Sequence, residues 1–529
     1  MTHPYWPIIY VRGYAMTRAE IDDTTADPFC GFNLGSTVFR ATTDKNKPQK
    51  FIFESPVVRL SAEYGYSCVF DGGLDIVDAS WQKTWIPAKS IIIYRYYDEA
   101  SRLLGTGETP DIETFGRELG RLILKVRALV CSDPQNPIAE SDFRCYLVAH
   151  SMGGLVCRAF LHGPKPNKDA RACVDKVFTY ATPHNGIDMA GINVPGWLGA
   201  NDLKNFNRGK MAKYLGLGNY FNGKDKDRVD WLPEDVFKSE KFFCMVGTNR
   251  ADYEVAMGLS RSFAGSGSDG LVRIANASVW GINKDESVSA PCATAYAYRS
   301  HSGYYGIVNS EEGYQNLVRF LFGDVRVDVW LDVTSVRLPP KVEEQRVAGK
   351  HVNALYQFEV LASLRDCRWF LTRRTSEEDS VACRTFEDLG SDDPTKRQIY
   401  LSTLFLSKKA REGKPLKSLA YSLFIGVRVP DYEVAHKLWP DDHFEGGYLY
   451  SDSARIEIMP PKNEGDEWNV VNTWQSDVGK DLTKADSFPV PATVFSDRIE
   501  MSLPFENKAS PGISGNLRFV ARNWNVWLE

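Results

Sequence analysis

The 529-residue chain lacks an apolar run long enough to cross a bilayer, and its first residues, Met1 to Pro7, lack the basic flank and apolar segment of a signal peptide. It also lacks an excess of basic residues: 63 Lys and Arg against 68 Asp and Glu give a net charge of −5. A polyanion would find no dominant basic patch. We therefore expect a soluble, cytoplasmic protein that does not bind nucleic acid.

The ten cysteines are scattered, without the regular spacing of metal ligands. Several lie in apolar segments (Cys145, Cys157, Cys173 and Cys244), where a buried free thiol is the usual state. Cys367 and Cys383 could pair, which the sequence leaves open. We expect neither a metal nor a cofactor.

The chain is too long for one ordinary domain, and its hydrophobic pattern changes near residue 325. Before that point, apolar strand-like runs alternate with segments of helical spacing; the strands are expected at 7–11, 90–97, 143–149, 174–182, 241–247 and 293–298, and the helices at 111–130, 154–161 and 310–321. This order predicts a mainly parallel sheet with helices on both faces, and ligands that bind beyond the carboxyl ends of its strands.

Two long segments interrupt this order. Residues 17–87 are irregular, with 51–60 as their most ordered piece, and we expect an insertion that shapes one side of a site. Residues 187–240 combine glycine and proline breaks with large apolar side chains, which favours a lid or cap over an apolar pocket; a packed helical insertion is the alternative.

A tight turn between the strand at 143–149 and the helix that follows contains Ser151. Ala149 and Gly153 stand two positions before and after it, which is the spacing of a nucleophile elbow with alanine in place of the first glycine. Short patterns of this kind also arise by chance in structural turns. The order of later residues is what favours a nucleophile.

An acid and a histidine follow Ser151 in the chain order that one Ser-Asp-His topology requires. Asp269 lies on a Gly-Ser-Asp-Gly turn after the strand at 241–247, and Asp252 is the rival acid. His301 follows the last strand of the first domain, whereas His351 lies beyond the change of pattern. Serine is a weak nucleophile that needs an imidazole to take its proton and a carboxylate to orient that imidazole.

Further residues near the strand ends are candidates for the same site. The backbone N–H groups of Tyr14, after the glycine that ends the first strand, and of Met152, at the start of the helix, would hold an oxyanion. Arg12, His150 and His184 are possible pocket residues, although a histidine such as His184 is more often structural.

Together these pieces resemble the α/β-hydrolase superfamily, specifically its lipase and esterase branch, which includes bacterial triacylglycerol lipases and PGAP-like GPI-inositol deacylases. The motifs that carry the resemblance, in chain order, are residues 10–14, 149–154, 181–186, 268–272 and 300–303. The family usually has His-Gly where this chain has Arg12-Gly13, so Arg12 could instead bind a substrate carboxylate or phosphate.

The resemblance implies a lipase or esterase that cleaves hydrophobic or lipid esters through an acyl-enzyme on Ser151, with His301 as base and Asp269 as its partner. An acyltransferase or thioesterase with the same triad is an alternative. A binding or assembly protein with a decayed hydrolase domain is another, and Arg12 is the feature in its favour.

Residues 325–529 predict an antiparallel β-sandwich, because alternating strands are separated by polar loops that contain glycine and proline. We therefore expect a catalytic domain at 1–324 and a β-sandwich accessory domain at 325–529. Its tryptophans could contact glycans or a membrane surface peripherally, although tryptophan is more often a core residue. The oligomeric state is left open.

Overall fold

The computed structural model describes residues 5–13, 36–41, 48–53, 56–71, 74–76, 81–94, 96, 111–189, 192–193, 203–221, 228–252, 267–302, 306–364, 367, 369–407, 419–435, 442–459, 469–477, 488–489 and 492–525. Its contacts divide the chain into two compact units. The first contains Met1–Thr294 and Tyr298–Leu317, and the second contains Ala295–Ala297 and Val318–Leu528. The domain limits expected from the sequence, including the roles of the segments 17–87 and 187–240, stay predictions.

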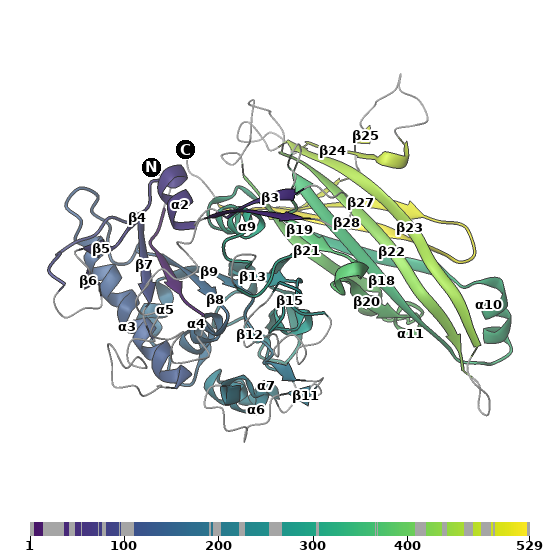
Figure 1. Ribbon diagram of the computed structural model, residues 1–529, viewed down its shortest axis with the longest axis horizontal. Coiled ribbons are helices and arrows are strands. Elements are labelled where there is room, and N and C mark those ends of the chain that lie inside the picture. The colour runs from purple at the N-terminus through teal and green to yellow at the C-terminus, as the bar shows by residue number, and fades with distance from the viewer. Residues whose placement is uncertain are drawn as a thin grey trace. The chain divides into compact units, whose positions relative to one another are not determined.

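A seven-stranded sheet organises the first unit (Figure 1). Its order is β16-β13-β9-β8-β1-β7-β4, and the pairings from β4 through β13 are parallel. The strands are β1 (Ile8–Val11), β4 (Ser67–Cys68), β7 (Ser90–Tyr94), β8 (Cys145–His150), β9 (Val174–Tyr180), β13 (Phe242–Gly247) and β16 (Ala293–Ala297). The strands expected from the apolar runs are therefore present, and they form the mainly parallel sheet that was predicted.

Helices cover this sheet, which explains why its central strands are apolar at consecutive positions. All four residues of β1 are buried, since alternate side chains face opposite layers. The core on one face joins β1, β7 and β8 to α3 (Ile112–Cys131) and α4 (Met152–His162), with α5 (Lys168–Ala172) next to α3. On β9, the Tyr180 hydroxyl donates to the Gly313 carbonyl of α9 (Glu311–Phe322) at 3.4 Å.

The segment 17–87 contains more regular structure than the sequence predicted. It includes the ribbon of β2 (Ser36–Ala41) and β3 (Pro48–Phe53), the helix α2 (Pro56–Tyr64), and the short pair β5 (Phe70–Asp71) and β6 (Leu74–Asp75). It also supplies β4, the edge strand of the main sheet. The two residues of β4 are too short a pattern to recognise, so their pairing with β7 was not foreseen.

The segment 187–240 also packs into the core of the first unit. Its described elements are β10 (Asp188–Met189), β11 (Ile192–Asn193), η2 (Leu203–Phe206), α6 (Arg208–Tyr214), α7 (Gly218–Phe221), β12 (Trp231–Pro233) and η3 (Ser239–Lys241, which ends just past it). β12 forms a small sheet with β14 (Trp280–Ile282) and β15 (Val288–Pro291). The short helix η5 (Ile274–Asn276) directly precedes β14 in the chain. Buried residues of this segment, such as Met211 and Leu215, join the same core as α4.

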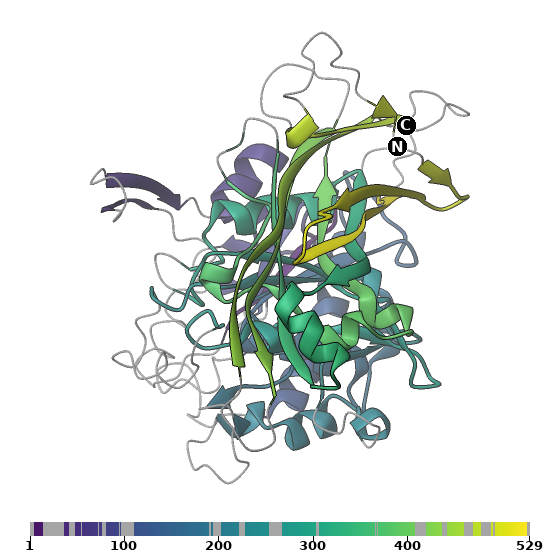
Figure 2. The ribbon, with the colours of Figure 1, turned by 90° about the vertical axis from the view of Figure 1, so that its right-hand side faces the viewer.

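The second unit is an antiparallel β-sandwich, as predicted. One sheet has the order β21-β17-β28-β27-β26 and the other the order β19-β18-β22-β23-β24-β25, with β20 also paired to β18. Figure 2 shows the long strands of this unit from the side, where they curve and twist. Side chains from both sheets share one apolar core, so the two layers face each other.

The strands of the sandwich are β17 (Val325–Arg337), β18 (Val352–Leu364), β19 (Thr372–Arg374), β20 (Ala382–Thr385), β21 (Gln398–Leu406), β22 (Leu419–Val434), β23 (Asp442–Met459), β24 (Asn469–Trp474), β25 (Phe488–Pro489), β26 (Ala492–Val494), β27 (Ile499–Glu506) and β28 (Gly512–Asn523). Its helices are short: α10 (Pro340–Val347), η6 (Ser376–Glu378), α11 (Phe386–Leu389), α12 (Pro394–Arg397) and η7 (Gln475–Asp477).

Two further expectations concern the described residues. None of their helices has the length and apolar character that crossing a membrane demands. No disulfide joins Cys367 and Cys383, so the pairing that the sequence left open is not formed.

Candidate active site

The turn that contains Ser151 joins the central strand β8 to α4. Ser151 has φ 52° and ψ −127°, a conformation that L residues rarely adopt and that is common where a functional side chain must be presented. A Cβ on Gly153 would overlap the carbonyl oxygens of Val11 and Arg12, so glycine is required for α4 to approach β1. The sharp turn therefore follows from local backbone geometry and from this close contact.

Asp269 lies in a turn beyond β13, and both of its carboxylate oxygens are engaged. Oδ1 accepts the backbone N–H groups of Leu271 at 3.0 Å and of Val272 at 2.8 Å. Oδ2 lies 2.9 Å from Nδ1 of His301. The side chain is only 1% exposed, so the turn holds the carboxylate in a fixed orientation away from bulk water.

His301 follows β16 and contacts both other residues. Its Nδ1 faces Asp269, and its Nε2 lies 2.9 Å from Oγ of Ser151. His301 is 3% exposed and Ser151 is 5% exposed. Three side chains from three separate strand ends thus form one hydrogen-bonded chain at the carboxyl edge of the sheet.

The order of these residues in the chain and their positions on the sheet identify the fold. A strained serine turn follows a central parallel strand, and the acid and the histidine follow later strands. The first unit has the α/β-hydrolase fold.

The chain has low similarity to two proteins of known structure. No family model and no curated protein matches the chain. Among solved structures it is similar to the Bacillus licheniformis lipase BlEst2 in propeptide form, with 12% identity, a TM-score of 0.29, and coverage of 88% of this chain and 96% of that one.

A second similar protein is the phospholipase PlaB from Legionella pneumophila, with 13% identity, a TM-score of 0.29, and coverage of 83% of this chain and 90% of that one. The same phospholipase in complex with thio-NAD gives 13% identity and a TM-score of 0.28, and the match covers 83% of this chain and 89% of that one. Similarity at this level carries no conclusion about activity.

The rival acid and base lie elsewhere. Asp252 accepts a hydrogen bond from Nδ2 of Asn249 at 2.6 Å, whereas the carboxylate that contacts His301 is that of Asp269. His351 belongs to the second unit, where its carbonyl accepts the N–H of Ala435.

Of the two residues expected to hold an oxyanion, Met152 lies among the described residues and Tyr14 does not. Met152 is the first residue of α4, at the positive end of that helix and next to Ser151. Tyr14 lies outside the described residues, and its neighbour Gly13 is the last residue described after β1. The oxyanion role of both N–H groups stays a prediction.

The three possible pocket residues occupy different surroundings. His150 is partly buried, and its Nε2 lies 2.8 Å from the carbonyl oxygen of His301. Arg12 is 2% exposed, and its carbonyl accepts the hydroxyl of Tyr96 at 2.8 Å. His184 is completely buried, with Nε2 3.1 Å from Oγ1 of Thr179. Of these three hydrogen bonds, only that of the His150 side chain reaches a member of the group formed by Ser151, His301 and Asp269.

Arg158 on α4 is a residue that the sequence reasoning missed. Its fully buried guanidinium donates to the carbonyl oxygens of His184, Val229 and Trp231 at 2.7–2.9 Å. These carbonyls stand on either side of the segment 187–228, so Arg158 ties both of its ends to the helix that follows Ser151. An arginine among the apolar residues of α4 was the available signal, since a buried charge needs specific partners.

His162, one turn further along α4, extends the same network. Its Nε2 accepts from Nε of Arg158 at 3.4 Å, and its Nδ1 lies 2.7 Å from the carbonyl oxygen of Leu215, just after α6. Burial, with a smaller contribution from the Arg158 charge, lowers the pKa of His162 to about 3. A neutral ring can donate to Leu215 and still accept from Arg158.

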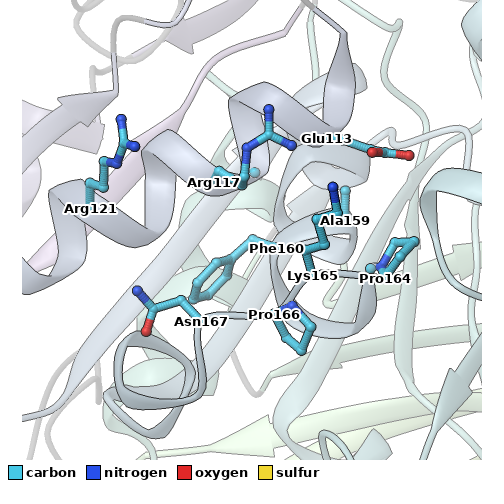
Figure 3. Close-up of a pocket in the computed structure, with 11 residues that line it drawn as sticks. Glu113, Arg117, Arg121, Ala159, Phe160, Pro164, Lys165, Pro166 and Asn167 are labelled. Carbon is cyan, nitrogen blue, oxygen red and sulfur yellow. The ribbon is translucent and has the colours of Figure 1, made fainter.

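A separate cavity of about 250 Å³ lies between α3 and the end of α4 (Figure 3). Figure 3 shows Arg117 and Arg121 projecting from one helix, with Phe160, Lys165 and Asn167 across from them. Its lining contains none of Ser151, Asp269 or His301. This cavity is therefore distinct from the candidate active site.

Three neighbouring side chains of the sandwich carry atoms that could act as metal ligands. The ligand atoms of Asp431, Glu433 and His443 lie within 4.8 Å of one another. These side chains are 38–59% exposed, and the His443 ring already lies 2.6 Å from Asp431. We assign no metal to this group.

Proposed function

We propose that the protein is a serine hydrolase that cleaves carboxylic esters through an acyl-enzyme on Ser151. The observation that carries the proposal is the continuous chain from Oγ of Ser151 through the His301 ring to Asp269, with 2.9 Å at each step. Residues 1–324 would carry the catalysis, and residues 325–529 would be an accessory domain.

The geometry supports a defined acylation step. Nε2 of His301 takes the proton of Ser151 as Oγ attacks the ester carbonyl, and the carboxylate of Asp269 holds the Nδ1 proton and stabilises the imidazolium. The negative charge moves to the carbonyl oxygen, which the N–H of Met152 and the N–H of Tyr14 would bind. When the tetrahedral intermediate collapses, His301 returns the proton to the departing alcohol.

Deacylation repeats these steps with water. Water attacks the acyl-enzyme while His301 takes its proton. His301 then protonates Oγ of Ser151 when the carboxylic acid leaves. A hydrophobic or lipid ester is the substrate class that the resemblance of residues 149–154, 268–272 and 300–303 to lipases and esterases implies. An alcohol or thiol acceptor in place of water would make the same site an acyltransferase.

A single set of measurements tests this proposal. We expect wild-type protein to hydrolyse p-nitrophenyl esters and to react with a fluorophosphonate probe, and Ser151→Ala to lose both properties while remaining folded. Ser132→Ala, which changes an exposed serine at the end of α3, is the matched control and should behave as wild type. Undiminished turnover or labelling of Ser151→Ala would refute the nucleophile.

The substrate class needs a second measurement. Turnover of a series of acyl chain lengths, and of phospholipids in vesicles, would separate a lipase from an esterase of short chains. Absence of both turnover and labelling in the wild type would favour the alternative of a binding protein with a decayed hydrolase domain.

A further inference from the structure

The ring of His150 contacts the backbone of the residue that serves as base in the proposed function. Its Nε2 lies 2.8 Å from the carbonyl oxygen of His301, and the two rings are 5.0 Å apart between centroids, at an angle of 44°. His150 is the last residue of β8 and directly precedes Ser151. The strand that presents the nucleophile therefore also contacts the loop that presents the base.

The backbone of His301 is held from two sides. Its N–H donates to the carbonyl oxygen of Asp269 at 3.0 Å, and its own carbonyl faces the His150 ring. The side chain is held in the same way, by Asp269 at Nδ1 and by Ser151 at Nε2. Among these four contacts, only the one from His150 comes from a side chain that takes no part in the proton transfer.

The protonation state of His150 suits this contact. Burial first, and the neighbouring His301 second, lower the pKa of His150 to about 3, so the ring is neutral at ordinary pH. A neutral imidazole has one N–H, and it must be on Nε2 to donate to a carbonyl. The ring thus adds no positive charge beside the imidazolium that forms on His301.

The space for this ring depends on Gly13. A Cβ at position 13 would lie 2.6 Å from Nδ1 of His150 and 3.1 Å from Cβ of Ser151. Any side chain at this position would displace the ring or the serine. The glycine that ends the first strand therefore leaves room for the ring that supports His301.

We propose that His150 is a positioning residue that holds the main chain of His301 so that its ring stays aligned with Ser151 and Asp269. The inference rests on the proposed function and adds a residue to it. Because a displacement of a catalytic group by about 1 Å can lower a rate by about 100-fold, the loss of this contact should reduce catalysis without removing any reacting atom.

Three substitutions separate positioning from packing. Glutamine can place its amide N–H at about the reach of Nε2 in histidine, whereas asparagine reaches only to the position of Nδ1, and alanine reaches neither. We expect His150→Ala and His150→Asn to lower kcat by about 10- to 100-fold with little change in KM. His150→Gln should recover most of the wild-type kcat. The rate of fluorophosphonate labelling should fall by the same factor as kcat, because both reactions need the base.

The comparison remains decisive if the alanine variant does not fold. Glutamine and asparagine are both amides, so a need for any polar side chain would be met by both, and equal kcat values for the two would overturn the inference. Wild-type kcat in a folded His150→Ala protein would overturn it as well. Either result leaves the proposed function intact provided that Ser151→Ala is inactive, whereas an active Ser151→Ala would refute both.

Discussion

His301 and Asp269 are joined twice, once through their side chains and once through their backbones. Nδ1 of His301 lies 2.9 Å from Oδ2 of Asp269, and the backbone N–H of His301 donates to the carbonyl oxygen of the same aspartate at 3.0 Å. The position of the imidazole is thus set by the turn at 268–272. The acid orients the base through the ring and through the main chain.

The first prediction concerns that carboxylate. We expect Asp269→Asn to lower kcat by about 10³- to 10⁴-fold, since an amide that donates toward Nδ1 favours the wrong tautomer of His301. The measurement is the steady-state hydrolysis of a p-nitrophenyl ester. Asp252→Asn is the control and should retain wild-type kcat; an inactive Asp252→Asn beside an active Asp269→Asn would reverse the assignment of the acid.

The second prediction concerns the turn at Ser151. We expect Gly153→Ala to lower the free energy of unfolding by about 3 kcal/mol and to reduce activity, because its Cβ would overlap main-chain oxygens that cannot move aside. Denaturant unfolding measures the effect. Gly218→Ala is the matched change, since no atom lies within 4 Å of its added Cβ, and we expect a change of less than about 0.5 kcal/mol. Equal losses in the two variants would contradict the close contact.

The third prediction concerns Arg158. Its replacement by methionine leaves three buried carbonyl groups without their donor, so we expect a loss of about 3 kcal/mol or more in the free energy of unfolding. Arg121→Met removes an arginine that is 74% exposed and pairs with Glu118, and should cost less than about 0.5 kcal/mol. A neutral Arg158→Met would show that other contacts hold the ends of the segment 187–228.

The fourth prediction concerns acid stability. Burial lowers the pKa of His150 and of His162 to about 3, and that of His184 well below its ordinary value. In the unfolded chain each ring titrates near pH 6.5, so below that pH the unfolded state binds more protons than the folded state. Stability is therefore fully present above about pH 6.5 and decreases as the pH falls toward 3. Together the three rings change the free energy of unfolding by at most about 4 kcal/mol per pH unit.

Denaturant unfolding between pH 7 and pH 4.5 measures this dependence. His162→Gln removes one of the three titrating rings, so the slope of the free energy of unfolding against pH should decrease by at most about 1.4 kcal/mol per pH unit. The His162 variant is compared with wild type at each pH, because carboxylates elsewhere add their own dependence to both proteins. An unchanged slope in the variant would mean that His162 does not titrate with unfolding.

Much of the fold could be read from local patterns. Runs such as Ile8–Val11 and Cys145–His150 are apolar at consecutive positions because both faces of the sheet are covered, and α3 shows helical spacing over its whole length. The two residues of β4 could not be found in this way. Their place at the sheet edge depends on pairing with Ser90 and Ile91, more than 20 residues away.

The candidate site likewise has features that the sequence predicts and features that it does not. The sequence by itself determined the serine turn, through Ala149 and Gly153, and the order Ser151, Asp269, His301, because short-range spacing and chain order are properties of the sequence. Only the tertiary structure decided that Asp269 rather than Asp252 meets His301, that Arg158 ties the ends of a long segment to α4, and that the His150 ring faces the His301 carbonyl. These contacts join residues 26 to 151 positions apart. They depend on how strands are ordered in the sheet and where each loop ends, which no local pattern encodes.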